Sequence, residues 1–152
     1  MNKKIILLII ILLLTGCKIS NSSKTIYEYY VTIDDVDIKV NRLFYLVDTT
    51  LGKYNNYEYN KDTGHYIYTY DDIEIETYIK NKEEKINSFW FTTDKYHTNE
   101  GISIGDNIKD IFSVYGNNYR YKDNTYRYEL NDSSITFFID NDIITGIEYD
   151  LI

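Results

Sequence analysis

The sequence predicts an α+β domain in which an antiparallel sheet carries two short helices on one face. Apolar and polar residues alternate along most of the chain after Thr25, the pattern of half-buried strands. Two shorter stretches instead place apolar residues at helical spacing, and each ends in a glycine. The connections between strands are short and polar, which favours hairpins and therefore antiparallel pairing.

The first element along the chain, residues 1–16, has the order of a secretory signal peptide. Lys3 and Lys4 precede an unbroken apolar run over residues 5–14. In a helix this run would span only about half of a ~30 Å hydrocarbon core, too little for a stable transmembrane helix. Because its removal takes away two lysines and no acid, the net charge of the exported part changes from −8 to −10.

The signal ends in Leu14, Thr15, Gly16 and Cys17, the one cysteine of the chain. These residues resemble the lipobox of bacterial lipoproteins. The resemblance implies a diacylglyceryl group on the Cys17 sulfur, cleavage after Gly16 and acylation of the new amino terminus. Two or three acyl chains, at about 0.8 kcal/mol per buried CH₂, give a lasting membrane anchor. Residues 18–24 are polar and read as a tether. The alternatives are an ordinary signal peptide and an uncleaved anchor.

The strands follow within a single domain, residues 25–152. Period-two alternation marks residues 25–33, 64–70, 73–80, 86–93, 126–130, 134–139 and 143–151. Two helices interrupt them. One is expected between an N-capping Asn41 and Gly52, the other between an N-capping Asp106 and Gly116. Since Tyr-rich strands follow each helix, the sequence predicts a tandem repeat of one helix plus strands, with half-repeats 25–97 and 98–152.

A motif in the second half resembles a known group of exported domains. Residues 98–106 read TNEGISIGD, a helix ending in Tyr-Gly follows, and residues 137–147 form an apolar final hairpin. This pattern is similar to the β-lactamase-inhibitor-protein-like fold and to outer-membrane assembly lipoproteins of the SmpA/OmlA (BamE) type. It covers residues 98–149 and, more loosely, 36–93. The resemblance implies a binding or scaffolding role. Because each half carries one helix rather than a pair, β-lactamase inhibition is not carried over.

Composition excludes several functions. With a net charge of −10 the exported domain has no surplus of Lys and Arg to neutralise phosphates, so nucleic acid is not an expected partner. The lone cysteine rules out an internal disulfide and a cysteine-based zinc site. Attachment to a membrane must therefore depend on lipid rather than on a basic face.

Candidate catalytic and metal-binding residues do not form convincing sets. Gly101 to Gly105 fit the G-x-S-x-G pattern, which makes a small hydrolase using Ser103 the enzymatic alternative. Both histidines, His65 and His97, precede Ser103, against the order of that fold. The acidic clusters lack calcium-loop spacing and fit turns. Glu74 and Glu76 share one strand face, which fits a solvated surface. No catalytic residue, metal or cofactor is predicted.

The tyrosines are the remaining signal, since the chain has 18 of them. Tyrosine is a good strand former and is also favoured in protein interfaces. The predicted interaction face consists of Tyr66, Tyr68, Tyr70, Trp90, Tyr126 and Tyr128.

Together these features predict a non-enzymatic, lipid-anchored envelope protein that binds another protein through an exposed sheet face. In a diderm host it would lie on the outer membrane facing the periplasm. Otherwise it would lie on the outer face of the cytoplasmic membrane. An accessory role in outer-membrane assembly is the further alternative.

Overall fold

The computed structural model describes residues 25–152, which contain ten strands and two short helices. In chain order these are β1 (Val31–Ile33), β2 (Val36–Ile38), α2 (Phe44–Leu51), β3 (Asn56–Asn60), β4 (His65–Thr69), β5 (Glu74–Lys80), β6 (Glu83–Phe91), α3 (Ile108–Tyr115), β7 (Arg120–Lys122), β8 (Thr125–Leu130), β9 (Ser133–Asp140) and β10 (Ile143–Leu151). The predicted signal and lipobox lie outside the described residues. Among residues 25–152, no helix is long and apolar enough to cross a membrane.

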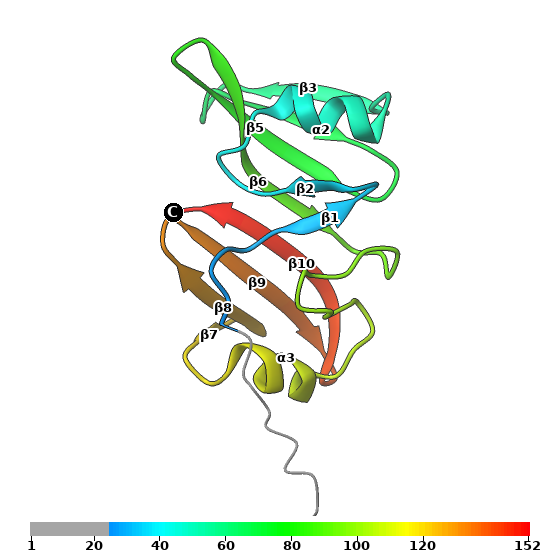
Figure 1. Ribbon diagram of the computed structural model, residues 1–152, viewed down its shortest axis with the longest axis vertical. Helices are drawn as coiled ribbons and strands as arrows, with labels where there is room; N and C mark the ends of the chain where they lie inside the picture. The colour runs from blue at the N-terminus through cyan, green and yellow to red at the C-terminus, as the bar shows by residue number, and fades with distance from the viewer. Residues whose placement is uncertain (1–24) are drawn as a thin grey trace, which may run out of the picture.

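Eight strands form one antiparallel sheet in the order β3-β4-β5-β6-β10-β9-β8-β7. The chain therefore fills one half of the sheet with β3 to β6 and the other half with β7 to β10, and the last strand of each half lies at the centre (Figure 1). At this central pairing Phe89 lies opposite Tyr149, and Phe91 lies opposite Ile147. One helix precedes the strands of each half.

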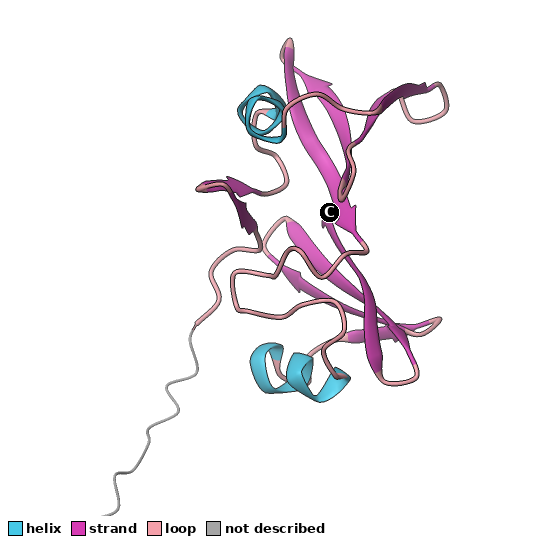
Figure 2. Cartoon of the chain, turned by 90° about the vertical axis from the view of Figure 1, so that its right-hand side faces the viewer, coloured by secondary structure: helices cyan, strands magenta, loops and turns pink. Residues whose placement is uncertain are grey.

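Both helices and the β1–β2 hairpin lie on one side of the sheet (Figure 2). This confirms the predicted antiparallel sheet with two short helices, although strands dominate the domain because each helix has only eight residues. The helices contribute few fully buried side chains, chiefly Val47 from α2 and Ile111 from α3. The short helices act as covers at the two ends of the sheet.

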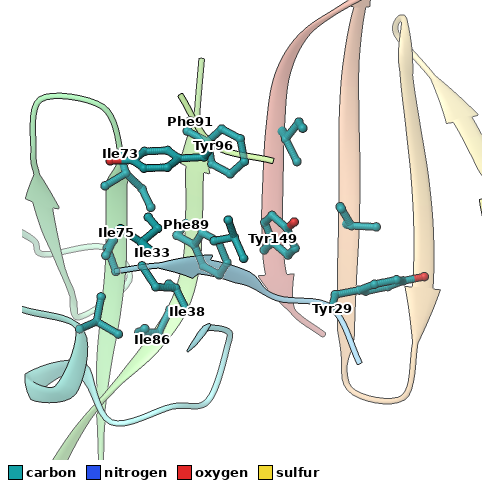
Figure 3. Packing of buried hydrophobic residues seen from close by; sticks show 14 of the residues in the cluster. Tyr29, Ile33, Ile38, Ile73, Ile75, Ile86, Phe89, Phe91, Tyr96 and Tyr149 are labelled. Atoms are coloured by element: carbon teal, nitrogen blue, oxygen red, sulfur yellow. The ribbon is translucent and has the colours of Figure 1, made fainter. Parts of the chain in front are cut away.

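The hydrophobic core is built between the sheet and the hairpin. Phe89 and Tyr149 stack across the central strand pair with ring centroids 4.4 Å apart, and each is only 1% exposed. Val31 and Ile38 of the hairpin are completely buried. The hairpin crosses the seam between the two halves, where its Ile33 and Ile38 point at Phe89 and its neighbours (Figure 3). It therefore ties the halves into one core.

The predicted strand over residues 25–33 is wrong in its extent. Only Val31–Ile33 is a strand, and it pairs with Val36–Ile38 in a separate two-stranded sheet. The chain reverses at Asp34 and Asp35, whose φ angles of 47° and 64° match a type I′ hairpin turn. Aspartate tolerates this left-handed backbone, so the strand ends at Ile33 as predicted. The strand starts later than predicted because residues 25–30 pair with no other strand among the described residues.

The helix boundaries also differ from the prediction. Asn107, rather than Asp106, is the N-cap of α3, because its side chain accepts a hydrogen bond from the Lys109 backbone N–H. Asp106 instead accepts from the backbone N–H of Ser103. The N-cap of α2 is Leu43, which makes no side-chain cap, whereas the Asn41 backbone N–H donates to Ile86 of β6. Tertiary contacts replace the expected cap there.

Candidate functional site

The side of the sheet away from the helices carries the candidate site, and we call it the open face. Strand pairing places two rows of side chains across its centre. The first row is Thr69, Glu74, Trp90, Glu148, Thr136 and Arg127; the second is Ile67, Glu76, Ser88, Asp150, Ser134 and Glu129. These rows combine residues from both halves of the chain, because β6 and β10 meet at the centre.

A shallow hollow of about 350 Å³ lies on the open face beside Trp90. Its lining includes Ile67, Glu74, Glu76, Trp90, Phe138 and Glu148. Trp90 is 40% exposed, in contrast to its neighbours Phe89 and Phe91, which are buried on the other side. A large aromatic ring held at the surface of a rigid strand is typical of protein interfaces.

Carboxylates surround this tryptophan. Glu74 and Glu148 lie directly opposite Trp90 on the two neighbouring strands. The pKa of Glu148 is raised to about 7, chiefly by burial and also by the Asp150 and Glu76 charges, while Arg127 opposes the rise. Burial likewise raises the pKa of Asp150, although Arg127 lies 3.1 Å from its carboxylate. The centre of the open face is thus short of positive charge.

The hydroxyl of Thr136, in the same row, makes no hydrogen bond within the described residues. Thr136 lies opposite Glu148 and is only 6% exposed, and its hydroxyl is buried. A buried hydroxyl without a partner is uncommon in folded proteins and costs about 1–3 kcal/mol. The Thr136 hydroxyl beside the Glu148 carboxylate is therefore a candidate contact for a ligand.

Phe138 forms the apolar wall of the hollow because Gly146 lies opposite it. A Cβ atom built on Gly146 would come within 3.3 Å of the Phe138 ring. The strand register also shifts here, between Ile144 and Gly146. The missing side chain lets the phenylalanine lie across β10, toward the hollow.

The predicted interaction face is wrong in grouping the tyrosines with Trp90. Tyr68 lies opposite Ile75 of the core and packs its ring 4.3 Å from Phe44 of α2. Tyr128 is buried opposite Ile135. By strand alternation Tyr66, Tyr70 and Tyr126 share this covered side, whereas Trp90 lies on the open face.

The covered tyrosines serve the core. Tyr70 donates a hydrogen bond to Asp48, and Tyr128 donates to the backbone carbonyl of Gly116 at the end of α3. Tyr126 packs against Phe112 and Tyr119. Burial raises the pKa of Tyr68, Tyr70 and Tyr128, which keeps them neutral donors. These rings hold the helices on the sheet.

A larger hollow of about 510 Å³ lies beside α2, on the covered side, near Phe44, Tyr54 and Tyr68. Its acidic groups already have partners within the protein. Asp48 accepts from Tyr70, and Glu84 accepts from Tyr68 and Thr77. The open face is the better candidate because polar groups there lack partners.

The Ser103 region does not assemble a triad in the structure. Ser103 and His97 form an isolated antiparallel bridge, and the Ser103 backbone N–H donates to Asp106. No hydrogen bond joins the Ser103 hydroxyl to a histidine within residues 25–152. His65 lies far along the chain on β4 and contacts Glu76. Within the same residues no group of three or more His, Cys, Asp or Glu could hold a metal ion.

Sequence reasoning found Trp90 and placed Glu74 and Glu76 on one strand face, but it assigned these two glutamates to a solvated surface. It missed Glu148, Thr136 and Phe138. The alternation of residues 143–151 does place Glu148 and Asp150 on one strand face. What sequence alone did not provide was the pairing of β10 with β6, which brings Glu148 beside Trp90.

No protein-family model matches the chain, and a search of curated proteins found no match either. A similar solved structure is that of an extracellular protein containing an SCP domain, from Bacillus anthracis strain Ames. The TM-score is 0.61 at 11% identity, and the match covers 87% of this chain. The chain spans 50% of that protein's length. At this identity the likeness shows the fold alone. The resemblance to inhibitor-type and SmpA/OmlA domains stays a prediction.

Proposed function

We propose that this chain is a membrane-anchored envelope lipoprotein whose domain binds another protein on the open face and has no catalytic activity. The observation that carries the proposal is the exposed Trp90 at the centre of a sheet face that neither helix covers. Central aromatic residues of this kind supply much of the energy of protein interfaces. The extracellular location of the structural neighbour supports export of the domain.

We also infer that the domain consists of two copies of one unit. Each half has one short helix followed by four strands. Val47 and Ile111 are the fully buried residues of the two helices, and Gly52 and Gly116 end them with φ angles of 78° and 76°. Because the last strands of the two units, β6 and β10, pair with each other, residues of both units meet at the centre of the open face. A binding surface at the junction of the units is expected to have this arrangement.

Trp90→Ala should reduce recovery of the bound partner about tenfold or more, as loss of a central aromatic anchor does. The measurement is quantitative co-purification from membranes after mild crosslinking. Tyr45→Ala is the matched control, because Tyr45 is an aromatic residue of α2 that is 63% exposed on the covered side. Equal recovery from wild type and Trp90→Ala would refute the proposed binding face.

Cys17→Ser should release a folded domain from the membrane if export still occurs. With a net charge of −10 after signal removal, the exported domain has no surplus of basic residues to hold it on anionic lipid. Cell fractionation measures the release, and the intact mass of the wild-type protein should correspond to a chain that starts at an acylated Cys17. A mature chain with any other start would contradict the lipoprotein assignment.

A further inference from the structure

The centre of the open face presents three groups that lack a partner and lie side by side in one row. Strand pairing places Glu148 between Trp90 and Thr136. No hydrogen bond or ion pair within residues 25–152 involves the Glu148 carboxylate, and the buried Thr136 hydroxyl is also without a partner. The ring of Trp90 is exposed. A carboxylate, a hydroxyl and an aromatic ring together suit a cation.

The positive charges near Glu148 are already engaged elsewhere. Arg127 pairs with Asp150 at 3.1 Å and with Glu129 at 3.6 Å. Arg120 also pairs with Glu129, and the Nδ1 atom of His65 lies 3.1 Å from Glu76. The other charged and titratable groups in the two rows, continued onto the edge strands, are Glu58 of β3, Glu74 and Glu76 of β5, Asp150 of β10, Arg127 and Glu129 of β8 and Arg120 of β7, and His65 of β4 lies beside Glu76. Acids outnumber bases, so the centre favours a cation.

We infer that the open face recognises a lysine or arginine side chain of its protein partner, an inference that rests on the proposed function. The cation lies over the Trp90 ring and pairs with Glu148, while the Thr136 hydroxyl accepts one of its hydrogen bonds. The apolar stem of the same side chain lies against the Phe138 ring, the apolar wall of the hollow next to Glu148. An acidic segment would meet mostly like charges at this centre and is therefore disfavoured.

Recognition of a basic side chain gives a function to the Glu148 carboxylate, whose ionised form destabilises the free protein. Burial and the neighbouring carboxylates raise the pKa of Glu148 to about 7, so Glu148 is protonated in part of the molecules near neutral pH. A bound ammonium or guanidinium group favours the ionised carboxylate and releases that proton. Binding of the basic side chain is therefore coupled to pH near neutrality.

The test uses the full-length chain in detergent and pentalysine as the probe, with binding measured by calorimetry or by Trp90 fluorescence. Glu148→Gln and Thr136→Val should each weaken binding, by about five- to tenfold for the charged partner. Glu58→Gln is the matched control: it changes the net charge equally and lies on the same open face, but on the edge strand β3, four strand positions from the β10 strand that carries Glu148. The control should stay within about twofold of wild type, the size expected of a screened distant charge.

The pH dependence gives a second readout. Wild-type affinity should fall by up to about tenfold from about pH 8 to about pH 6, because protonation of Glu148 removes the charge that attracts the probe. Glu148→Gln should abolish most of this dependence. His65→Gln should keep it, which separates Glu148 from the histidine that contacts Glu76.

The outcomes separate this inference from the proposed function. Weakening by equal factors in Glu148→Gln and Glu58→Gln would show general attraction to an acidic protein and overturn the inference. No binding of pentalysine, while the partner still co-purifies through Trp90, would also overturn it and leave the binding face intact. Loss of the partner's dependence on Trp90 would instead refute the proposed function.

Discussion

Phe89→Ala should destabilise the protein by about 3–5 kcal/mol, the range for removing a buried phenylalanine ring. Phe89 is 1% exposed, stacks on Tyr149 across the central strand pair and lies opposite Ile75 on β5. Its loss leaves a cavity at the seam of the two halves, below the β1–β2 hairpin, where a rigid sheet cannot collapse to fill it. Urea unfolding at neutral pH, followed by circular dichroism, measures the change.

Tyr45→Ala provides the comparison for this substitution, because it also removes a large aromatic ring but from the surface of α2. We expect its effect to stay within about 0.5 kcal/mol, as for exposed positions generally. If the two halves unfolded independently, Phe89→Ala would split the transition into two steps. A single, shifted transition is expected, since β6 and β10 share one core.

Glu148→Gln should stabilise the protein at about pH 8 by about 1–2 kcal/mol. Burial first, then the Asp150 and Glu76 charges, raise the pKa of Glu148 from 4.5 to about 7 in the folded state. Between these values the unfolded chain releases the proton that the folded protein keeps, so wild-type stability falls as the pH rises and the full penalty applies above about pH 7. The shift corresponds to about 3 kcal/mol. Because the group is partly exposed, solvent screening reduces this figure.

Glutamine carries no charge, so the gain from Glu148→Gln should shrink toward zero as the pH approaches about 5. The measurement is urea unfolding of both proteins across this pH interval. Glu58→Gln, on the edge strand β3, should show no comparable gain. A gain independent of pH, or greatest at low pH, would contradict a raised pKa for Glu148.

Phe89→Ala and Glu148→Gln test the two opposite faces of one sheet. Neighbouring residues on β6, Phe89 and Trp90, serve the core and the open face respectively. The predicted loss of stability in Phe89→Ala results from lost packing. The predicted gain in Glu148→Gln results from removal of a partly buried carboxylate whose ionised form destabilises the folded protein. Residues that are unfavourable for stability yet well placed for contact are expected at functional surfaces.

Local pattern was sufficient for much of the fold. Alternation marked β5, β6, β9 and β10, and glycine at the end of each apolar stretch marked α2 and α3. These features depend on neighbouring residues, so a single sequence contains them. The start of β1 shows the limit: Asp34 and Asp35 fitted the turn that follows this strand, but alternation over residues 25–30 read as strand although these residues pair with no strand within the described chain.

The local sequence pattern did not predict which face of the sheet each side chain occupies. Alternation shows that Tyr66 and Tyr68 share a side, but it does not show that helices cover that side. The pairing of Tyr68 with Ile75 and of Ile75 with Phe89 places these three residues on one side. Trp90, the next residue along β6, therefore lies on the face opposite the tyrosines with which it was grouped.

The candidate site depends on contacts even more distant in sequence. Glu148 and Trp90 are neighbours only because β10 returns to pair with β6 at the centre of the sheet. The missing partner of Thr136 is a property of the folded environment rather than of the residue type. Nothing in a stretch of sequence could have revealed it.

Photocrosslinking in living cells tests the central claim most directly. A photoreactive phenylalanine analogue would replace Trp90 on the open face and, in a separate strain, Tyr45 on the covered side. We expect a discrete protein adduct from position 90 and none from position 45. Adducts from position 45 alone, or lipid as the sole adduct from position 90, would contradict a protein-binding open face.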